Sequence, residues 1–389
     1  MTPPTFVCLT NVPTPYRDFF FTELRRQLEE LGWRLEVWFM ARHDARRTCH
    51  WQAGDFDFPH KFLSGWTTRF LGHDLSFNWD VRRLLREVQP EALLIGGAWI
   101  DPTVWISARS RFAQQTIFWS ESHLRSMDHT SSVARFLRRL ALNRFRSFAV
   151  PGRLAREYVE KYVPSPQIYC LPNLVDPEVF RDAVRKQRAE QRNTQRRRAL
   201  LIVARLSPEK GLVPFLESLQ YLDPHERAKL ALWIAGAGPL RAALQQRIAE
   251  FGDIEFQLLG DQPQSEMVRL YAHADGFCLP SLADPNPLSV IEALWVGLPL
   301  LLSSRAGNHP EALENGGNGF LFDPTNPRGS ADAISRWLAL SDDELSTFGS
   351  KSSRIARERF EPQAAIRAFL SDVLLPEQRP ILTKAAGQS

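Results

Sequence analysis

The sequence predicts an α/β protein made of two doubly wound domains, each a parallel sheet covered by helices. Three observations support this fold class. The chain has 389 residues, which is more than a single hydrophobic core usually organises. Short apolar runs alternate with helical patterns along its length, which is typical of successive βαβ units. A polar, basic run over residues 181–198 divides the alternation into two parts of similar size.

The first half contains six apolar runs that we expect to be strands and five segments that we expect to be helices. The strands are predicted at Phe6–Thr10, Leu35–Phe39, Ala92–Ile95, Thr116–Trp119, Ser147–Val150 and Gln167–Leu171. The helices are predicted at Tyr16–Leu31, Trp79–Val88, Pro102–Arg111, Ser131–Arg144 and Arg153–Tyr162. Because helices connect successive strands, the strands are expected to be parallel.

The second half repeats the pattern. Its strands are predicted at Ala199–Ala204, Leu230–Ala235, Glu255–Leu259, Gly276–Leu279 and Leu298–Ser303, and a last helix at Pro362–Leu375. We therefore divide the chain into an N-terminal domain (1–180), a basic linker or surface insertion (181–198), a C-terminal domain (199–361) and a C-terminal helix and tail (362–389) that can pack back on the first domain. In such folds the ligand lies at the C-terminal ends of the strands.

The charge is unevenly distributed along the chain. Residues 1–180 carry a net charge of +4, the basic run +6, and residues 199–389 carry −6. A basic first half favours anionic lipid or a phosphorylated acceptor as its partner, and the alternative is an arginine-rich solvated surface. No recognition motif for nucleic acid accompanies the charge, so we expect no nucleic-acid partner.

Cysteine usage and the first residues predict a cytoplasmic protein. Cys8, Cys49, Cys170 and Cys278 are far apart and form no CxxC pair, which fits a reducing compartment and no zinc site. The start of the chain has neither a basic region nor a long apolar run, so we expect no signal peptide there. No apolar stretch reaches the ~18 residues of a membrane span.

Residues 131–148 read as a basic amphipathic helix with no acidic residue. Phe136, Leu137, Leu140 and Phe145 alternate with five arginines, and such a helix can lie on an anionic membrane at the inner face of the bilayer. The alternative is an ordinary helix packed on the sheet with an arginine-rich outer face. The five arginines are Arg135, Arg138, Arg139, Arg144 and Arg146.

The stretch Pro280–Leu294 contains two carboxylates eight residues apart. Asp284 precedes a predicted helix and Glu292 lies inside it. Pro287 suits the first helical position, where its missing N–H group is no loss, and Gly297 suits the end.

The first N–H groups of this helix, at Leu288, Ser289 and Val290, would form an anion site at its positive end. Glu292 lies about 6 Å further along the helix axis. A nucleotide sugar fits this spacing, with its diphosphate on the helix end, its ribose diol on Glu292 and its sugar towards Asp284.

Two further loops follow predicted strands in the second half. Arg205 and Lys210 lie five residues apart in ARLSPEKG, from where both can reach a diphosphate, or both can simply be solvated. AGAGPLR, which contains Gly236, is only a partial GxGxxG pattern. It favours a tight turn, and it also permits a close approach of the backbone to a ligand.

The ordered motifs ARLSPEKG, AGAGPLR, LLGD, PSLADPNPLSVIEALWVGLPLL, SSRAGNHPEAL and GNGFLFDP resemble the retaining family 4 glycosyltransferases of the GT-B fold. The resemblance covers residues 199–325 closely. In the first half it rests on NVPTPYRDFFFTEL, LIGGAW and LPNLVDPEVF. It implies two Rossmann-like domains facing each other across a cleft.

The resemblance also implies an activity. A glycosyl group would move from a nucleotide diphosphate sugar to an acceptor hydroxyl with retention of anomeric configuration. The acceptor would be a sugar, a lipid-linked molecule or a polysaccharide, in the synthesis of cell-surface polysaccharide, lipopolysaccharide or glycolipid.

The resemblance assigns roles at matching positions. Arg205 and Lys210 match the cations that neutralise the donor diphosphate, and Asp284 and Glu292 match the two acids of the Glu-x7-Glu motif. Leu288 and Ser289 match backbone phosphate contacts, and Gly260 lies in the loop against the base. Gly236 lies in AGAGPLR, another of the matching motifs, and is a candidate for contact with the nucleotide. Two departures, the shorter Asp284 and the run 285–287 in place of Gly-Phe-Gly, favour a subgroup with its own donor or acceptor.

Four residues of the first half are candidates for the acceptor side. Tyr16 and Arg17 follow the first predicted strand and can stack on and pair with an acceptor, or merely begin a helix. Glu121 and His123 follow a later strand, and either of them can position the acceptor hydroxyl.

We expect no metal and no cofactor. Asp55-Phe56-Asp57 is formally an Asp-x-Asp pattern, which elsewhere binds a metal–diphosphate complex, but three residues arise easily by chance. Arg205, Lys210 and the helix end can neutralise the diphosphate instead. Two alternatives to transfer stay open, namely a GT-B sugar-nucleotide epimerase and a non-catalytic nucleotide-sugar-binding partner.

Overall fold

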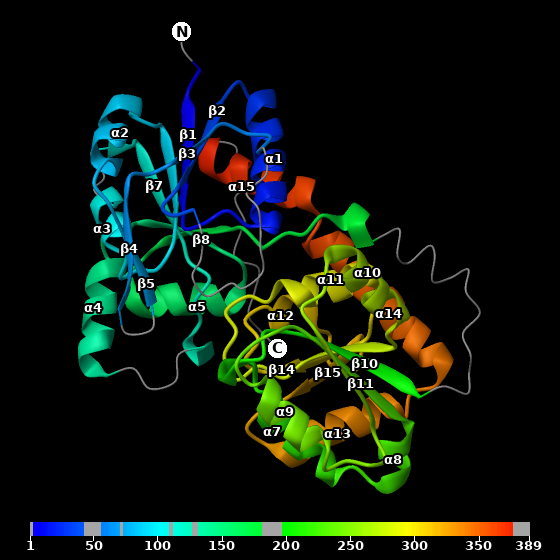
Figure 1. Ribbon diagram of the computed structural model, residues 1–389. Coiled ribbons are helices and arrows are strands. Elements are labelled where there is room, and N and C mark those ends of the chain that lie inside the picture. The colour runs from blue at the N-terminus through cyan, green and yellow to red at the C-terminus, as the bar shows by residue number, and fades with distance from the viewer. Residues whose placement is uncertain are drawn as a thin grey trace, which may run out of the picture.

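The computed structural model describes residues 3–42, 56–70, 73–108, 112–126, 131–180 and 197–375. Within these residues the chain forms two parallel sheets of seven and six strands, one in each half. The sheets belong to two bodies that lie one above the other in Figure 1, each with helices on both sides of its sheet. The predicted α/β class is confirmed.

The first sheet has the strand order β3-β2-β1-β6-β7-β8-β9 and is parallel throughout. Successive strands are added on one side from β1 to β3 and on the other side from β6 to β9. The topological switch point of this sheet therefore lies between β1 and β6. The central strands are buried apolar runs, as expected for a sheet covered on both faces. The bounds are β1 Thr5–Thr10, β2 Arg34–Phe39, β3 His60–Phe62, β6 Ala92–Gly96, β7 Gln115–Trp119, β8 Ser147–Val150 and β9 Gln167–Cys170.

The helices of the first half cover the two faces of this sheet. Helix α1 packs on one face together with the last described helix of the chain, and the cluster on the other face includes residues of α2, α3 and α5. The bounds are α1 Pro15–Glu30, α2 Val81–Val88, α3 Pro102–Ser107, α4 Ser132–Leu142 and α5 Arg153–Tyr162.

An antiparallel hairpin, β4 (Gly65–Phe70) and β5 (His73–Asn78), was not expected from the sequence. It is anchored by partners about 25 residues away, since Ser76 N donates to Asp101 Oδ2 and Asn78 N to Thr103 Oγ1. Strand β3 was also missed, because its three residues are too few for a periodic pattern.

The second sheet has the order β12-β11-β10-β13-β14-β15 and is also parallel, with its switch point between β10 and β13. Only β15 was not expected. The strands are β10 Arg198–Val203, β11 Leu230–Ala235, β12 Glu255–Gly260, β13 Gly276–Leu279, β14 Leu300–Ser303 and β15 Gly319–Phe322. The helices are α7 Leu212–Ser218, α8 Pro224–Lys229, α9 Arg241–Ile248, α10 Gln264–His273, α11 Leu288–Val296, α12 His309–Ala312, α13 Pro327–Leu338 and α14 Asp342–Arg359.

The chain leaves the first body earlier than the boundary at residue 180. Leu174 packs in the core of the first sheet, whereas Val175 and Phe180 pack in the core of the second. The Phe180 ring lies edge-on to Tyr271, with 5.9 Å between ring centroids. Most of the basic linker, residues 181–196, lies outside the described residues.

Helix α15 (Pro362–Leu374) returns to the first body and packs beside α1 (Figure 1). Phe369 lies edge-on to Tyr169 of β9, and Gln27 Nε2 donates to Gln363 O at 3.1 Å. The first body is therefore built from two separate stretches of sequence. In the part of the chain that the structure describes, no helix is both long and apolar enough to cross a bilayer.

Candidate functional site

Two loops meet at the switch point of the second sheet, one after β10 and one after β13. Lys210 Nζ donates to Asp284 Oδ2 at 2.5 Å, and only 17% and 8% of the two side chains is exposed. Ser281 Oγ faces the same carboxylate oxygen at 3.4 Å. The structure thus pairs a cation and an acid that the sequence analysis placed in the same site but did not expect to be partners.

The backbone locks these two loops together. Glu209 O accepts hydrogen bonds from Leu282 N at 2.9 Å and from Ala283 N at 3.0 Å. Gly211 has a φ of +66°, and a Cβ there would lie 2.2 Å from Pro280 O. Only glycine fits such an approach. Gly211 therefore allows the loop that carries Lys210 to pack directly against the loop that carries Asp284.

The loop carrying Asp284 also touches the first body. Asp284 O accepts from Gly307 N at 2.8 Å and faces His123 Nε2 at 3.1 Å. A Cβ on Gly307 would lie 1.6 Å from Pro285 O and 2.9 Å from the His123 ring. The backbone of this loop is therefore held from both sides of the interdomain contact.

His123 is 1% exposed, and burial lowers the pKa of its imidazole against the opposing hydrogen bond to Asp284 O. A neutral ring whose Nε2 faces a carbonyl oxygen must donate from that nitrogen. Arg125 Nη1 also reaches across to Ser304 O at 3.2 Å. This geometry favours a positioning role for His123 and leaves Glu121 as the more open candidate for the acceptor hydroxyl.

Arg205 lies on the more open side of the same loop. Its guanidinium donates to Glu209 Oε1 at 2.7 Å, and 54% of the side chain is exposed. Partial burial pushes the pKa of Glu209 up, but hydrogen bonds from Ser207 and from its own backbone, with the charges of Arg205 and Lys210, hold that pKa below its usual value. Arg205 is therefore paired, yet remains accessible to an anionic ligand.

Helix α11 begins at Leu288, one residue later than expected, and Pro287 is its N-cap instead of its first helical residue. Pro287 is extended, and its carbonyl accepts from Asn308 Nδ2 at 2.8 Å, 21 residues further along the chain. Among the described residues, the N–H groups of Leu288, Ser289 and Val290 have no hydrogen-bond partner. The expected anion site at this helix end is thus geometrically available.

Glu292 lies one turn into α11, partly buried. Its Oε2 accepts from the Tyr271 hydroxyl at 2.6 Å, and that hydroxyl lies 3.2 Å from Ser289 O. Burial raises the pKa of the Glu292 carboxyl, while the hydrogen bond from Tyr271 lowers it. Tyr271 was missed because a tyrosine in a helix 21 residues upstream carries no local signal.

The remaining loops of the second sheet approach the backbone of the Arg205 loop. Gly236 has a φ of +140°, its N–H donates to Gly260 O at 2.7 Å, and a Cβ on it would lie 2.0 Å from Ala204 O. Gly260 also has a positive φ, of +74°. Both glycines sit where the backbone requires them, and their contact with a nucleotide stays a prediction.

The acceptor-side candidates lie at the C-terminal ends of β1 and β7 in the first sheet. Tyr16 and Arg17 are in the first turn of α1. The Arg17 guanidinium lies 4.7 Å from the Trp119 ring centroid, and its Nη2 lies 4.0 Å from Glu121 Oε1. The structure therefore brings Arg17 and Glu121 together.

The Asp-x-Asp pattern has only one described member, since Asp55 lies outside the described residues. Asp57 is exposed and lies 3.8 Å from Arg25 Nη1. The described part of the chain contains no group of three His, Cys, Asp or Glu side chains that could hold a metal.

Helix α4 differs from the predicted arginine face. Arg138 is 4% exposed and stacks against Trp99, Tyr158 and Tyr162, with 5.2 to 6.0 Å from guanidinium carbon to ring centroid. Burial of its long stem and planar group among rings explains why it points inwards. The outward face carries four exposed apolar side chains. They are Val133, Phe136, Leu137 and Leu140.

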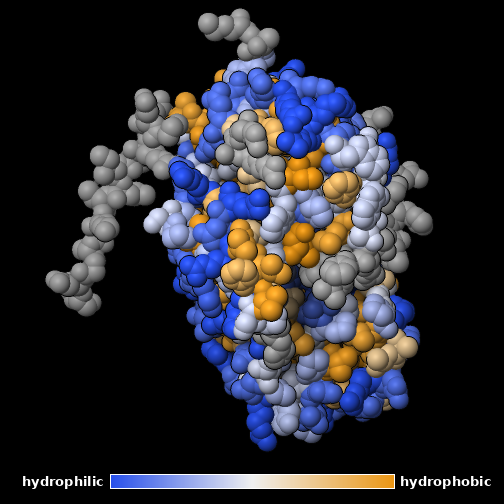
Figure 2. All heavy atoms as spheres, turned by 90° about the vertical axis from the view of Figure 1, so that its left-hand side faces the viewer, coloured by the Kyte–Doolittle hydropathy of each residue, from blue (hydrophilic) through white to orange (hydrophobic). Residues whose placement is uncertain are grey.

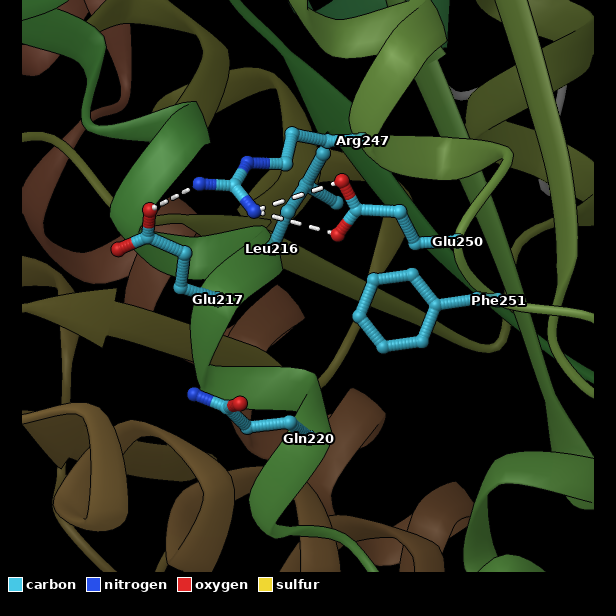
Figure 3. Close-up of a pocket in the computed structure, with 6 residues that line it drawn as sticks. All are labelled: Leu216, Glu217, Gln220, Arg247, Glu250 and Phe251. Atoms are coloured by element: carbon cyan, nitrogen blue, oxygen red, sulfur yellow. Dashed lines mark hydrogen bonds and ion pairs between the residues drawn. The ribbon is translucent and has the colours of Figure 1, made fainter.

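A cavity of about 280 Å³ lies elsewhere, at the C-terminal ends of α7 and α9 (Figure 3). Arg247 projects between Glu217 and Glu250 and pairs with them at 3.1 and 3.2 Å. Lys210 and Gly236 precede the opposite ends of these helices, and α9, with eight residues, is about 12 Å long. The cavity is therefore separate from the candidate site, and its cation is already paired. Its lining is Leu216, Glu217, Gln220, Arg247, Glu250 and Phe251.

Comparison with known proteins identifies what the chain is similar to. The family model described as "Glycosyl transferases group 1" matches residues 183–354. The amylovoran biosynthesis glycosyltransferase AmsK of Erwinia amylovora is 38% identical over 147 residues, covering 36% of this chain and 34% of that protein. The UDP-Gal:alpha-D-GlcNAc-diphosphoundecaprenol alpha-1,3-galactosyltransferase of Escherichia coli is 28% identical over 199 residues, half of each chain.

The chain thus spans between a third and a half of the length of these two relatives. Among solved structures, Anabaena HepE in complex with UDP superposes with a TM-score of 0.72 at 17% identity, covering 95% of this chain and 99% of that one. A likeness at this identity shows the fold, which is the expected GT-B architecture.

Proposed function

Because residues 183–354 match the family model of glycosyl transferases group 1, we propose that this chain is a member of that family and moves a sugar from a nucleoside diphosphate sugar to an acceptor hydroxyl. The observation that carries the proposal is the buried Lys210–Asp284 pair beside the free N–H groups of α11. A cation, a positive helix end and an acid at one switch point suit a diphosphate and the sugar attached to it.

We assign the donor to the second body. Its diphosphate would lie between Lys210, Arg205 and the N-terminus of α11, and its ribose diol against Glu292. Asp284 would then face the sugar hydroxyls. Its loop is stiffened by Pro285 and Pro287. The named structural neighbour binds UDP, which makes a uridine nucleotide the first donor to test here.

The proposed chemistry is transfer with retention of anomeric configuration. The bond from the anomeric carbon to the diphosphate oxygen breaks, and a bond to the acceptor oxygen forms on the same face of the sugar. The proton of the acceptor hydroxyl passes to the leaving diphosphate. Lys210 and Arg205 would stabilise the negative charge that grows on this group, a task that preorganised cations perform well in a water-poor site.

The test is incubation of the purified protein with a panel of UDP-, GDP-, ADP- and dTDP-sugars and a broad set of sugar acceptors. Formation of a nucleoside diphosphate together with a glycosylated acceptor is expected for one donor. Epimerised donor without an acceptor would favour the epimerase alternative, and binding without turnover would favour the non-catalytic one. Because both relatives above are named as transferases, transfer is favoured.

We propose that no metal is required for this reaction. Activity of the proficient donor–acceptor pair is therefore expected to persist in excess EDTA. A loss that Mg²⁺ or Mn²⁺ restores would contradict this and return attention to Asp55 and Asp57.

We also propose that α4 holds the protein reversibly on an anionic membrane, near a lipid-linked acceptor. Its exposed Phe136 and Leu140 can insert among acyl chains, while Arg135 and Arg139 can meet lipid phosphates. Figure 2 views the side on which α4 lies in Figure 1 and shows hydrophobic side chains gathered among hydrophilic ones there. The Escherichia coli relative is named for a diphosphoundecaprenol acceptor, which supports this location.

Co-sedimentation with phosphatidylglycerol-containing vesicles is expected at low salt. It should weaken at 1 M salt, where the Debye length falls to about 3 Å. The double variant Phe136→Ser/Leu140→Ser should lose binding at both salt concentrations, whereas Leu31→Ser, an exposed apolar position at the end of α1, should bind like the native chain. Equal vesicle binding by the native chain, the double variant and Leu31→Ser would show that α4 does not contact the membrane.

A further inference from the structure

The switch point of the first sheet carries polar groups that the donor site does not use. Strands β1, β6 and β7 are neighbours, and Gly96 at the end of β6 pairs with Trp119 at the end of β7. Thr10 ends β1. In doubly wound sheets, ligands bind outside the strand ends at this position.

Several of these polar atoms are buried without a partner. Thr10 is 2% exposed and Thr14 is 5% exposed, and the Oγ1 atom of each has no hydrogen bond in the described structure. Arg17 Nη1 and Trp119 Nε1 are also buried and unpartnered. Because a buried polar atom without a hydrogen bond destabilises the fold, these atoms are available to a ligand that can supply the missing bonds.

Two of the atoms border one point in space. A Cβ built on Gly96 would lie 3.7 Å from Thr10 Oγ1 and 3.8 Å from Arg17 Nη1, with no atom closer than 3.6 Å. These are ordinary van der Waals distances, so the position has room for one methyl-sized atom, such as one oxygen of an oxyanion, and the hydroxyl and the guanidinium nitrogen both border it. We call this position beside Gly96 the gap. Both can donate, and one of them carries a fixed positive charge.

The first turn of α1 brings Arg17 to this gap. Thr14 is the N-cap residue, yet its side chain makes no cap hydrogen bond. Asp18, the acid of this turn, is near His60, and burial raises the pKa of its carboxyl. Arg17 instead stacks on Trp119.

We infer that this gap binds an oxyanion, a phosphate or a carboxylate, carried by the acceptor next to the hydroxyl that receives the sugar. The inference deepens the proposed transfer reaction and rests on it. Thr10 Oγ1 and Arg17 Nη1 hold the anion. Glu121, 4.0 Å from Arg17 Nη2, accepts the neighbouring hydroxyl.

The acceptor fits this gap better than the donor does. The donor diphosphate already has Lys210, Arg205 and three helix N–H groups in the second body. Glu121 beside the gap would repel an anion that had no hydroxyl to offer, but it completes a site for a molecule that carries both groups. The site therefore selects acidic or phosphorylated acceptors over neutral ones.

The first experiment measures stabilisation against heat by inorganic phosphate, with UDP present at saturation to occupy the donor site. UDP is titrated first. If UDP does not raise Tm, that result counts against the proposed donor site and not against the oxyanion site. In that event the phosphate titration is repeated in Lys210→Gln, where the donor-side cation is absent. In either background, phosphate is expected to raise Tm in a concentration-dependent manner.

Two variants probe the gap. Gly96→Ala places a methyl group in it without a clash, and Arg17→Gln removes the charge. Each is expected to weaken phosphate binding by about tenfold or more, while Gly96→Ala keeps or raises Tm without ligand. Arg82→Gln, which removes an exposed arginine of α2, should behave like the native chain. Phosphate binding that is absent, or unchanged in both gap variants, overturns the inference.

A second experiment identifies the source of the oxyanion. Glucose 1-phosphate, glucuronic acid and methyl glucoside are compared as stabilising ligands under the same conditions. A phosphate site favours the first and a carboxylate site the second, and in both cases Gly96→Ala weakens the stabilisation as it does for inorganic phosphate. Equal stabilisation by methyl glucoside would show that charge is not recognised and would overturn the inference.

Discussion

Replacing Lys210 by methionine is expected to lower kcat by about 10²–10³-fold, the usual cost of removing one preorganised group that stabilises developing charge. Affinity for the nucleoside diphosphate should fall less. The reason is that negative charge on the leaving diphosphate grows as the glycosidic bond breaks, so the ammonium group interacts more strongly with the transition state than with the bound donor.

The measurement is steady-state kinetics together with calorimetric titration of the nucleotide. Removal of Lys210 also leaves Asp284 buried without its partner, which destabilises such sites by about 3–5 kcal/mol. Thermal unfolding is therefore recorded in parallel. The double variant Lys210→Met/Asp284→Asn should recover Tm but not kcat. Recovery of both would mean that Lys210 serves only to hold the loop.

Arg205→Met is the matched comparison, because Arg205 lies on the same loop but is half exposed and paired with Glu209. A smaller loss of kcat is expected, since solvent screens an exposed charge. Equal effects on binding and turnover in Lys210→Met would contradict the leaving-group role.

Glu292→Ala is expected to weaken nucleoside diphosphate binding by about 10–100-fold. A hydrogen bond from a ribose hydroxyl to a charged acceptor contributes about 1.5–3 kcal/mol, and partly buried Glu292 is screened little by solvent. Titration with the nucleotide and with its 2′,3′-dideoxy analogue forms a double cycle. The variant should bind both equally, whereas the native chain should prefer the nucleotide with the diol. An unchanged nucleotide affinity would contradict this placement of the ribose.

Tyr271→Phe is the control for that experiment, because it keeps the carboxylate and removes only the hydroxyl that donates to it. The tyrosine lowers the pKa of Glu292, so without it burial raises that pKa further. The ionised form is then lost at a higher pH as pH falls. Nucleotide affinity of Tyr271→Phe should therefore decline at a higher pH than that of the native chain.

The central strands were predictable from the sequence because each is a buried apolar run with turn residues on both sides. Strand β15 (Gly319–Phe322) was not predicted, although it lies within GNGFLFDP, one of the motifs that carry the resemblance. The hairpin β4–β5 was missed for another reason: its backbone is tied to Asp101 and Thr103, and Trp66 is exposed. Local pattern carries no information about partners that distant.

The candidate site likewise has features that local sequence patterns predict and features that depend on contacts between distant residues. Helix start signals and spacing led to Asp284 and Glu292, whereas the hydrogen bond from Lys210 to Asp284 joins residues 74 positions apart. Arg138 was misassigned to an outer face because charge alone predicts exposure. Its aromatic neighbours, among them Trp99 and Tyr158, come together only in the folded chain.

The return of α15 to the first body has a consequence for biosynthesis. Its side chains Ile366, Phe369 and Val373 belong to the same core as Phe6 and Leu94, so the half that the ribosome makes first is completed last. At about 5–20 residues per second, the 200 residues between Leu174 and Leu374 take roughly 10–40 s to translate. During that interval α1 covers only part of this face of the first sheet, and the part that α15 later covers stays open. The second body, whose strands and covering helices lie between Val175 and Phe360, can meanwhile finish folding. The nascent chain is therefore most exposed to chaperones and proteases on the face that α15 later covers.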